Sequence, residues 1–237
     1  MSGQAWLSVR EHPLFSVAIT LLAFQFALLL YRRSGWLVLQ PVMISMLLVI
    51  AILLACGVDY STYRQGVSPI SLLLGPATVA LAVPVFQNLR RIRQLLWPIL
   101  ITLVVGGVLT VLLTVLIGYL LGVRLPVLVT LSTKSVTMPI AMLLADQAGG
   151  IASLAALLVM LTGVIGAAFG PLLLGLARVD HPAARGMSYG MNAHAIGTVR
   201  ALEEGDECGA FAALAMSLLG LLTAVVLPLC AGWLGSH

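Results

Sequence analysis

The chain has 237 residues, of which 61% are hydrophobic and only 8% are charged. Soluble domains have about 45–50% apolar and about 25% charged residues, so this composition excludes a soluble enzyme, a disordered tail and a nucleic-acid-binding domain. The formal net charge of +4 is expected to reflect arginines in cytoplasmic loops and not an anionic partner. We therefore predict an all-α polytopic membrane protein that forms one transmembrane domain, residues 1–237, in a lipid bilayer.

Apolar segments follow one another along the chain, and we expect about six to eight of them to enter the membrane, where a spanning helix needs about 20 apolar residues. Five segments have the character of ordinary spans: residues 14–31, 35–58, 95–123, 151–177 and 208–234. Three others are interrupted or polar. Residues 70–89 contain Gly75-Pro76 and Pro84, residues 125–145 contain Lys134 and Pro139, and residues 187–202 are short and polar.

Arginines predict the orientation of these segments. They cluster at Arg32-Arg33, at Arg90, Arg91 and Arg93, and at Arg178 and Arg185. Because arginine-rich loops stay in the cytoplasm, all three clusters should share that side, with the N-terminus outside. A full crossing by residues 125–145 would turn the third cluster outward. We therefore expect residues 125–145 to be re-entrant or broken, since irregular backbone at membrane depth survives only inside protein or along a wet cavity.

A faint internal repeat accompanies this pattern. Val58-Asp59 is followed by Arg64 at the interval at which Val179-Asp180 is followed by Arg185, and residues 77–79 echo residues 197–199. The matches predict two halves, residues 35–123 and 151–235, with opposite topology, although chance is a rival explanation. Interrupted segments at corresponding places in two inverted halves are typical of a transporter binding site.

Lys134 is the only lysine in the chain and lies near the middle of an apolar segment. A lysine near the bilayer centre costs roughly 2.5–3.5 kcal/mol, so such a residue is a functional candidate that needs an anion. We expect Lys134 to pair with a substrate carboxylate while Ser135 and Thr137 donate hydrogen bonds. Pro139 should break the helix and free backbone N–H groups that also attract anions. The alternative is a loop lysine whose side chain reaches the interface.

His194 lies between Gly190 and Gly197, and these flanking glycines permit tight turns and close backbone approach. We expect Asn192, His194 and Thr198 to hold the hydroxyl or keto end of the substrate, and His194 could also relay a proton. The alternative is a core histidine that packs broken helix ends. A metal site is not expected, because no second histidine or cysteine lies nearby.

Two further residues are candidates with strong alternatives. Thr78 is the only polar side chain in residues 75–84, where close packing of small residues explains the sequence equally well. Arg200 is a second candidate cation for the substrate, but a positive loop residue is an equal reading.

The acidic residues of the chain fall outside the centres of the apolar runs: Glu11, Asp59, Asp146, Asp180, Glu203, Glu204, Asp206 and Glu207. This distribution argues against a cation antiporter that uses a buried carboxylate pair and against a membrane hydrolase that needs a buried acid. The chain also has no glycine-rich phosphate loop with a lysine. We therefore expect a protein without enzymatic activity or cofactor, in which facilitated diffusion and proton cotransport through His194 both remain open.

Several motifs in order resemble the LrgB/CidB family of bacterial membrane proteins. They occupy residues 75–84, 134–142 (KSVTMPIAM), 149–151, 163–173 (GVIGAAFGPLL), 194–203 (HAIGTVRALE) and 209–211. The resemblance covers roughly residues 57–229. Thr133 and Met138 depart from the family pattern beside the lysine motif, which leaves the substrate open.

The resemblance implies two alternative functions. One makes family members transporters of small carboxylates such as pyruvate, glycolate or glycerate, the last two being exported by plastid relatives. The other makes them holin- or antiholin-type regulators of murein hydrolase export and cell lysis. Both imply a small LrgA/CidA-like membrane partner and the bacterial inner membrane, and we also expect a homo-oligomer. The residues themselves favour the transporter, because a pore needs no single buried lysine flanked by hydroxyls and helix breakers.

Overall fold

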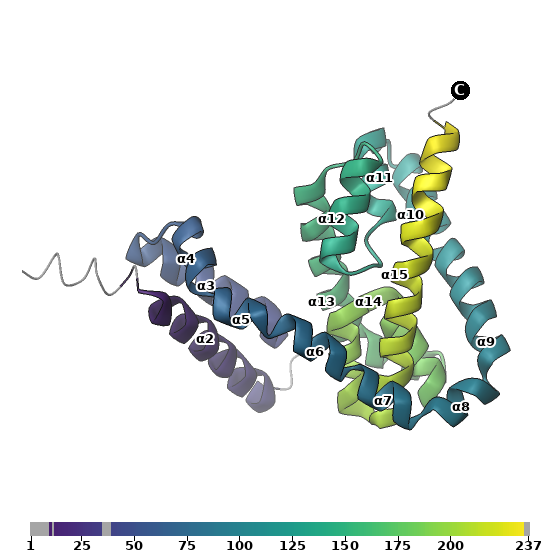
Figure 1. Cartoon of the computed structure of the whole chain (residues 1–237), viewed down its shortest axis with the longest axis horizontal. Helices are drawn as coiled ribbons and strands as arrows, with labels where there is room; N and C mark the ends of the chain where they lie inside the picture. The colour runs from purple at the N-terminus through teal and green to yellow at the C-terminus, as the bar shows by residue number, and fades with distance from the viewer. Residues whose placement is uncertain (1–9, 11, 35–38, 235–237) are drawn as a thin grey trace, which may run out of the picture. The chain divides into compact units, whose positions relative to one another are not determined.

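The structure, a computed structural model, describes residues 10, 12–34 and 39–234. Its secondary structure in these residues is entirely helical, as predicted (Figure 1). The chain divides into two compact units, residues 1–80 and 81–237, which are described in turn.

Five helical stretches in the described residues are long and apolar enough to cross a membrane. They are Pro13–Ser34, Ser68–Gln87, Leu96–Leu120, Ala152–Leu176 and Asp206–Pro228. Large apolar side chains on these stretches are exposed, for example Leu112, Leu116 and Leu120, which is expected where the surrounding solvent is lipid. The chain is therefore a multi-pass membrane protein. The larger number of membrane segments and the inverted repeat stay predictions.

The first unit is a helical pair followed by short helices. α2 (Pro13–Ser34) packs on α3 (Pro41–Cys56) through Ile19 and Ala23 against Val49 and Leu53. α3 has only 16 residues, so it is shorter than the span predicted for residues 35–58, of which 35–38 lie outside the described residues. The chain continues through α4 (Tyr60–Gly66), α5 (Ser68–Leu72) and α6 (Leu74–Ala80). A turn at Leu73 separates α5 from α6, although Ser68–Gln87 as a whole is long and apolar enough to span a membrane.

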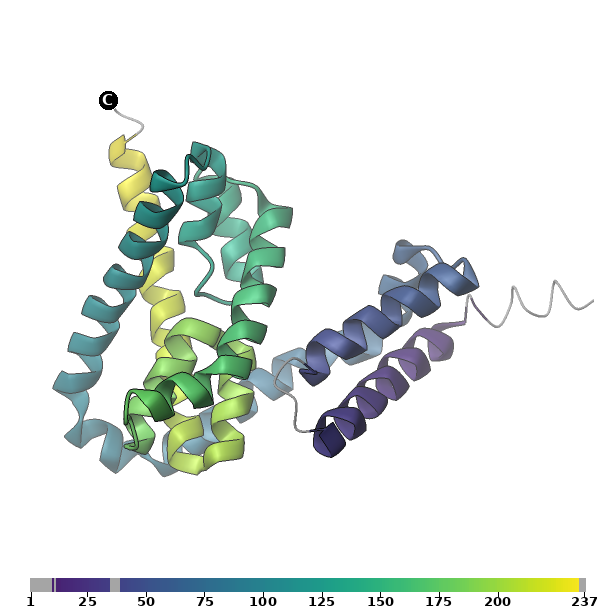
Figure 2. The ribbon, with the colours of Figure 1, turned by 180° about the vertical axis from the view of Figure 1, so that it is seen from behind.

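The second unit contains the remaining helices, seen from two sides in Figures 1 and 2. They are α7 (Ala82–Gln87), α8 (Leu89–Gln94), α9 (Leu96–Ile101), the π-helical turn η1 (Thr102–Gly106), α10 (Gly107–Leu120), α11 (Leu125–Ser132), α12 (Met138–Gln147), α13 (Ala152–Leu176), α14 (Pro182–Glu204) and α15 (Asp206–Leu234). The stretch from α9 to α10 and the helix α15 both run the length of this unit, and α11 and α12 lie at the end opposite α7 and α8.

The core of the second unit forms where α9, η1, α14 and α15 meet. Leu103, Met191 and Leu219 belong to one buried cluster there. Gly106, the last residue of the π-helical turn, permits close contact, because a Cβ at this position would lie 2.9 Å from the Met191 side chain. The turn was not predicted, since residues 95–123 have the apolar composition of a plain span.

Charged residues gather at one end of the second unit. Arg91 in α8 lies 3.4 Å from the carboxylate of Glu207 and 3.0 Å from the ring of His181. His181 lies between Arg178 and Arg185 in the sequence. Two of the arginine clusters therefore lie at one end of the second unit, and the prediction that they share the cytoplasmic side stays a prediction. We call this end, with Arg91, Arg185 and Arg200, the arginine end.

Candidate functional site

The interrupted segment around Lys134 folds as a hairpin of two short helices, α11 and α12, which we call the lysine hairpin (residues 125–147). The hydroxyl of Thr130 in α11 accepts a 2.8 Å hydrogen bond from the main-chain N–H of Ile151, which follows α12. α12 has ten residues and is therefore about 15 Å long. The chain thus travels away from Thr130 through residues 133–137, and α12 brings it back.

The break in this hairpin lies before Pro139. α12 begins at Met138 and carries Pro139 in its first turn, where a missing N–H costs nothing. The hydroxyls of Ser132 and Thr133 donate to carbonyls of α11, at 2.6 Å to Val129 and 2.9 Å to Thr130. These bonds supply hydrogen-bond donors to carbonyls in the last turn of α11, one of which also accepts from the main-chain N–H of Thr133. Pro139 therefore starts a helix, and the two hydroxyls finish the preceding one.

Lys134 lies at the tip of the lysine hairpin. Its ammonium group donates a 3.3 Å hydrogen bond to the hydroxyl of Ser135. The lysine side chain is half-buried, Ser135 and Val136 are buried, and Thr137 is half-buried at the N-cap position of α12. The positive end of the α12 dipole therefore lies at the same tip as the lysine charge.

The polar segment around His194 forms α14, which doubles back on itself. We call it the histidine hairpin (residues 182–204). Arg185 donates a 2.7 Å hydrogen bond to Glu204, although 19 residues separate them. A straight helix would hold residues 19 apart at about 28 Å. A Cβ at Gly197 would come within 2.6 Å of the Tyr189 carbonyl oxygen, so the returning half lies against the first half.

His194 forms the turn of the histidine hairpin. Its backbone has φ 39° and ψ −126°, which breaks the helix at this residue. The ring is buried, and its Nε2 lies 2.9 Å from the main-chain oxygen of Val159 in α13. A Cβ at Gly163 would come within 2.6 Å of the ring. The glycine therefore makes room for the imidazole beside α13.

The tips of the two hairpins meet at the same part of α13. Val159 binds the His194 ring through its carbonyl, and its side chain belongs to one buried cluster with Val136, two residues after Lys134. The hairpins reach this point from opposite ends, because Ile151 begins α13 beside the lysine hairpin while Gly170, near the other end of α13, packs on Tyr189 of the histidine hairpin.

The other predicted site residues are placed less favourably. Thr198 is buried, but its hydroxyl donates a 2.8 Å hydrogen bond to the His194 carbonyl. Asn192 is exposed and donates to the Ser188 carbonyl at 3.0 Å. Arg200 donates to Glu203 at 2.7 Å, near the base of the histidine hairpin. Thr78 lies in α6 of the first unit, and its side chain is outside the described part of the structure.

Comparison with known proteins identifies the family of this chain. The family model described as LrgB-like family matches residues 20–233. The chain belongs to the LrgB-like family. It is 30% identical to proteins named "Antiholin-like protein LrgB" from Bacillus cereus (strain B4264) and Bacillus anthracis (strain CDC 684 / NRRL 3495), over 94% of this chain and 97% of each relative. No solved structure matches it.

The LrgB-like match includes both hairpins and the helix between them, and the structure adds residues there that the sequence did not predict. The Val159 carbonyl binds His194, and a main-chain oxygen leaves no trace in a sequence. Gly163, Gly166 and Gly170 form the face of α13 on which α14 packs, and their spacing was the available signal. Glu204 was placed by the sequence only outside the centres of the apolar runs, whereas its side chain is 16% exposed and binds Arg185.

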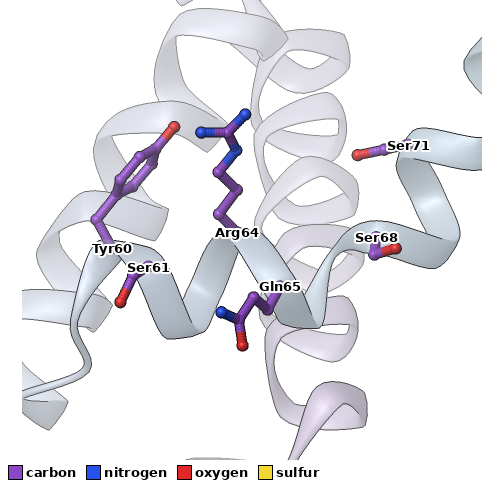
Figure 3. Close-up of a pocket in the computed structure, with 6 residues that line it drawn as sticks. All are labelled: Tyr60, Ser61, Arg64, Gln65, Ser68 and Ser71. Atoms are coloured by element: carbon purple, nitrogen blue, oxygen red, sulfur yellow. The ribbon is translucent and has the colours of Figure 1, made fainter.

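The first unit of this LrgB-like chain has a polar hollow of about 600 Å³. Figure 3 shows its lining side chains along α4 and α5: Tyr60, Ser61, Arg64, Gln65, Ser68 and Ser71. None of these is a predicted site residue. Within the described residues, no three His, Cys, Asp or Glu side chains are grouped so that they could hold a metal ion.

Proposed function

We propose that this LrgB-like chain is a membrane transporter of small organic anions, namely 2-hydroxy or 2-keto monocarboxylates such as glycolate, glycerate and pyruvate. It would work in the bacterial inner membrane, as a homo-oligomer, together with a small LrgA/CidA-like membrane partner. The observation that carries the proposal is the meeting of the Lys134 and His194 tips beside Val159. Two broken segments that meet inside a membrane protein are typical of a transporter site.

The charges around the tips favour an anion. Lys134 contributes a half-buried ammonium group. α12 and the returning half of α14 both begin at the tips, and the N-terminus of a helix carries partial positive charge. Among the described residues, no carboxylate forms an ion pair with Lys134. A substrate carboxylate would balance this charge, with Ser135 and Thr137 supplying hydrogen bonds.

The two hairpins would be re-entrant and would approach the site from opposite sides of the membrane. With the arginine end in the cytoplasm, the histidine hairpin would enter from the cytoplasm and the lysine hairpin from outside. A site between two such hairpins can face either side through small movements of one or the other. This is the arrangement that alternating access requires.

A second candidate function is regulation of murein hydrolase export and cell lysis. The relatives at 30% identity are named antiholin-like, and that name favours this reading. Altered carboxylate flux could produce lysis effects indirectly, so the two functions are separated by measuring flux and not by measuring lysis.

Uptake into proteoliposomes tests the proposal. Labelled pyruvate, glycolate and glycerate are offered to vesicles that contain this chain alone or with its LrgA/CidA-like partner. We expect saturable uptake, and we expect Lys134→Ala to abolish it while the variant still inserts and elutes as a folded protein. Arg124→Ala is the matched control, because Arg124 is an exposed cation at the start of the lysine hairpin.

Each outcome decides something. Uptake that requires the partner makes this chain one subunit of a two-part transporter. Uptake that survives in Lys134→Ala removes the lysine from the site. Folded protein without saturable flux in any arrangement overturns the transporter proposal and leaves the antiholin reading.

A further inference from the structure

Glu204 closes the base of the histidine hairpin. One carboxylate oxygen accepts a 2.7 Å hydrogen bond from Arg185, and the other accepts a 2.7 Å hydrogen bond from the hydroxyl of Tyr189. Arg200 lies 3.6 Å from the second oxygen. The side chains of Arg185 and Glu204 are only 18% and 16% exposed. Both oxygens of one carboxylate therefore join the two halves of α14 at the arginine end.

The turn that this base closes is strained. His194 has a positive φ of 39°, which is unfavourable for any residue with a Cβ. Strained backbone persists only where the surroundings fix it. At the tip, the Val159 carbonyl holds the ring. At the base, Glu204 keeps the returning half beside the first half, so opening the base lets the turn relax.

The lysine hairpin is closed in a different way. Its base is joined by the Thr130 hydroxyl and the main-chain N–H of Ile151, without a charged side chain. Its returning helix is fixed to α13 through Ala141 and Ala145, which are both fully buried. Of the two hairpins, only the histidine hairpin has a base that one ion pair holds. Buried side chains also hold the returning half of the histidine hairpin, since Ala201 is fully buried in one cluster with Tyr189 and Ala212. What distinguishes its base is the ion pair, which can be broken without removing a packed apolar side chain.

We infer that Glu204, with Arg185 and Tyr189, is a lock on the histidine hairpin, and that opening this lock uncovers the His194 tip toward the arginine end. The gating role rests on the transport function proposed above, whereas the lock itself is a property of the fold. Glu204 is thus a positioning residue that acts through His194. In this arrangement the histidine hairpin is the moving gate on one side of the site, and the lysine hairpin stays fixed on the other side.

Hydrogen exchange followed by mass spectrometry on the full chain in lipid nanodiscs tests the lock directly. We expect Glu204→Gln to raise the exchange rate of backbone amides in residues 195–204 by about tenfold, because glutamine keeps the shape but loses the charge. Glu203→Gln is the matched control, since Glu203 is the neighbouring carboxylate, is 54% exposed and pairs with Arg200. It should leave this exchange unchanged.

Two further variants keep the test decisive if Glu204→Gln folds poorly. Tyr189→Phe removes one hydrogen bond and keeps the ring that packs on Gly170, so it should give a smaller increase in the same amides. Exchanging the charges, Arg185→Glu with Glu204→Arg, should restore part of the protection.

The lock and the transport function fail in different ways. Exchange in Glu204→Gln that equals the Glu203→Gln control overturns the lock whatever the uptake results are. Faster exchange in a chain that shows no carboxylate flux supports the lock and overturns only its role as a transport gate.

Discussion

Lys134 and His194 are unusual for different reasons, one chemical and one conformational. Lys134 is the only lysine of the chain, and its type and position in an apolar segment were enough to predict it as a candidate. His194 is distinguished by its backbone, which turns the chain at φ 39°. The flanking glycines were expected to permit tight turns and close backbone approach. Gly190 and Gly197 do lie close to neighbouring backbone, whereas the turn itself is made by the histidine.

Glu204 makes the stability of the molecule depend on pH. Burial by itself raises the pKa of this carboxyl group, but the hydrogen bonds from Arg185 and Tyr189 outweigh burial and hold the pKa below its ordinary value of 4.5. Arg200 adds to this lowering, and Cys208 also faces the carboxylate. The folded chain therefore binds this proton less tightly than the unfolded chain does. The stabilisation is complete at neutral pH and is lost as the pH falls through the folded pKa.

We accordingly expect the thermal unfolding midpoint of the purified protein to fall on acidification below about pH 4.5. Part of that fall should be absent in Glu204→Gln, which has no proton to gain at this position. Tryptophan fluorescence measured at a series of pH values gives both curves. A Glu204→Gln curve parallel to that of the unaltered protein would contradict the assignment, and Glu203→Gln provides the reference.

At the scale of elements, glycines allow the histidine hairpin to pack between α13 and α15. Gly163, Gly166 and Gly170 receive it on α13, and Gly186 and Gly190 bring its own backbone against α15. A Cβ at Gly190 would collide with the carbonyl oxygen of Ala212. Small residues are how membrane helices approach closely without a hydrophobic driving force. The packing of a polar, bent segment inside the unit depends on these positions.

Gly190→Ala should destabilise the protein, because the collision is with backbone and not with the end of a flexible side chain. Overpacking of this kind costs about 1–3 kcal/mol, which lowers the unfolding midpoint by several degrees. Gly175→Ala is the matched control, since nothing lies within 4 Å of the added Cβ. Alanine is the better helix former by up to about 1 kcal/mol, so this variant should be as stable or more stable. Equal midpoints for the two variants would refute the packing argument.

At the largest scale, the two hairpins connect the long helices of the second unit at its opposite ends. α10 and α13 are joined through the lysine hairpin at one end, and α13 and α15 are joined through the histidine hairpin at the arginine end. This arrangement explains why the two arginine clusters of the second unit lie at the same end, although the apolar lysine hairpin lies between them in the sequence. An even number of crossings separates Arg91 from Arg185 when the lysine hairpin returns to the side from which it came.

Cysteine labelling in intact cells tests this topology. In a chain whose native cysteines are replaced by alanine, Arg124→Cys and Gln147→Cys flank the lysine hairpin, and both positions are exposed. A membrane-impermeant maleimide should label both from outside. Asp180→Cys, at the arginine end, should react only after the membrane is opened. Labelling of Arg124→Cys and Gln147→Cys from opposite sides would mean that the segment crosses.

The features that could be predicted from the sequence are those that depend on residue type and charge. The helical class, the break in residues 125–145 and the common end of two arginine clusters follow from apolar length, Lys134 and the arginine positions. The return of each hairpin was beyond reach, because it depends on contacts such as Thr130 with Ile151 and Arg185 with Glu204. Thr198 and Asn192 have the polarity of site residues, but their hydrogen bonds go to nearby carbonyls, which helix geometry decides. The predicted repeat that relates residues 35–123 to residues 151–235 stays a prediction.

The carbonyl group of Val159 has no hydrogen to donate, so Nε2 of His194 carries the hydrogen of their 2.9 Å bond. A neutral imidazole has one N–H, and this bond therefore fixes the tautomer and leaves Nδ1 as a lone pair. A molecule that bonds to the neutral ring must bring its own hydrogen. A hydroxyl on carbon 2 of a small acid can do so, and a keto oxygen at the same carbon has none to offer.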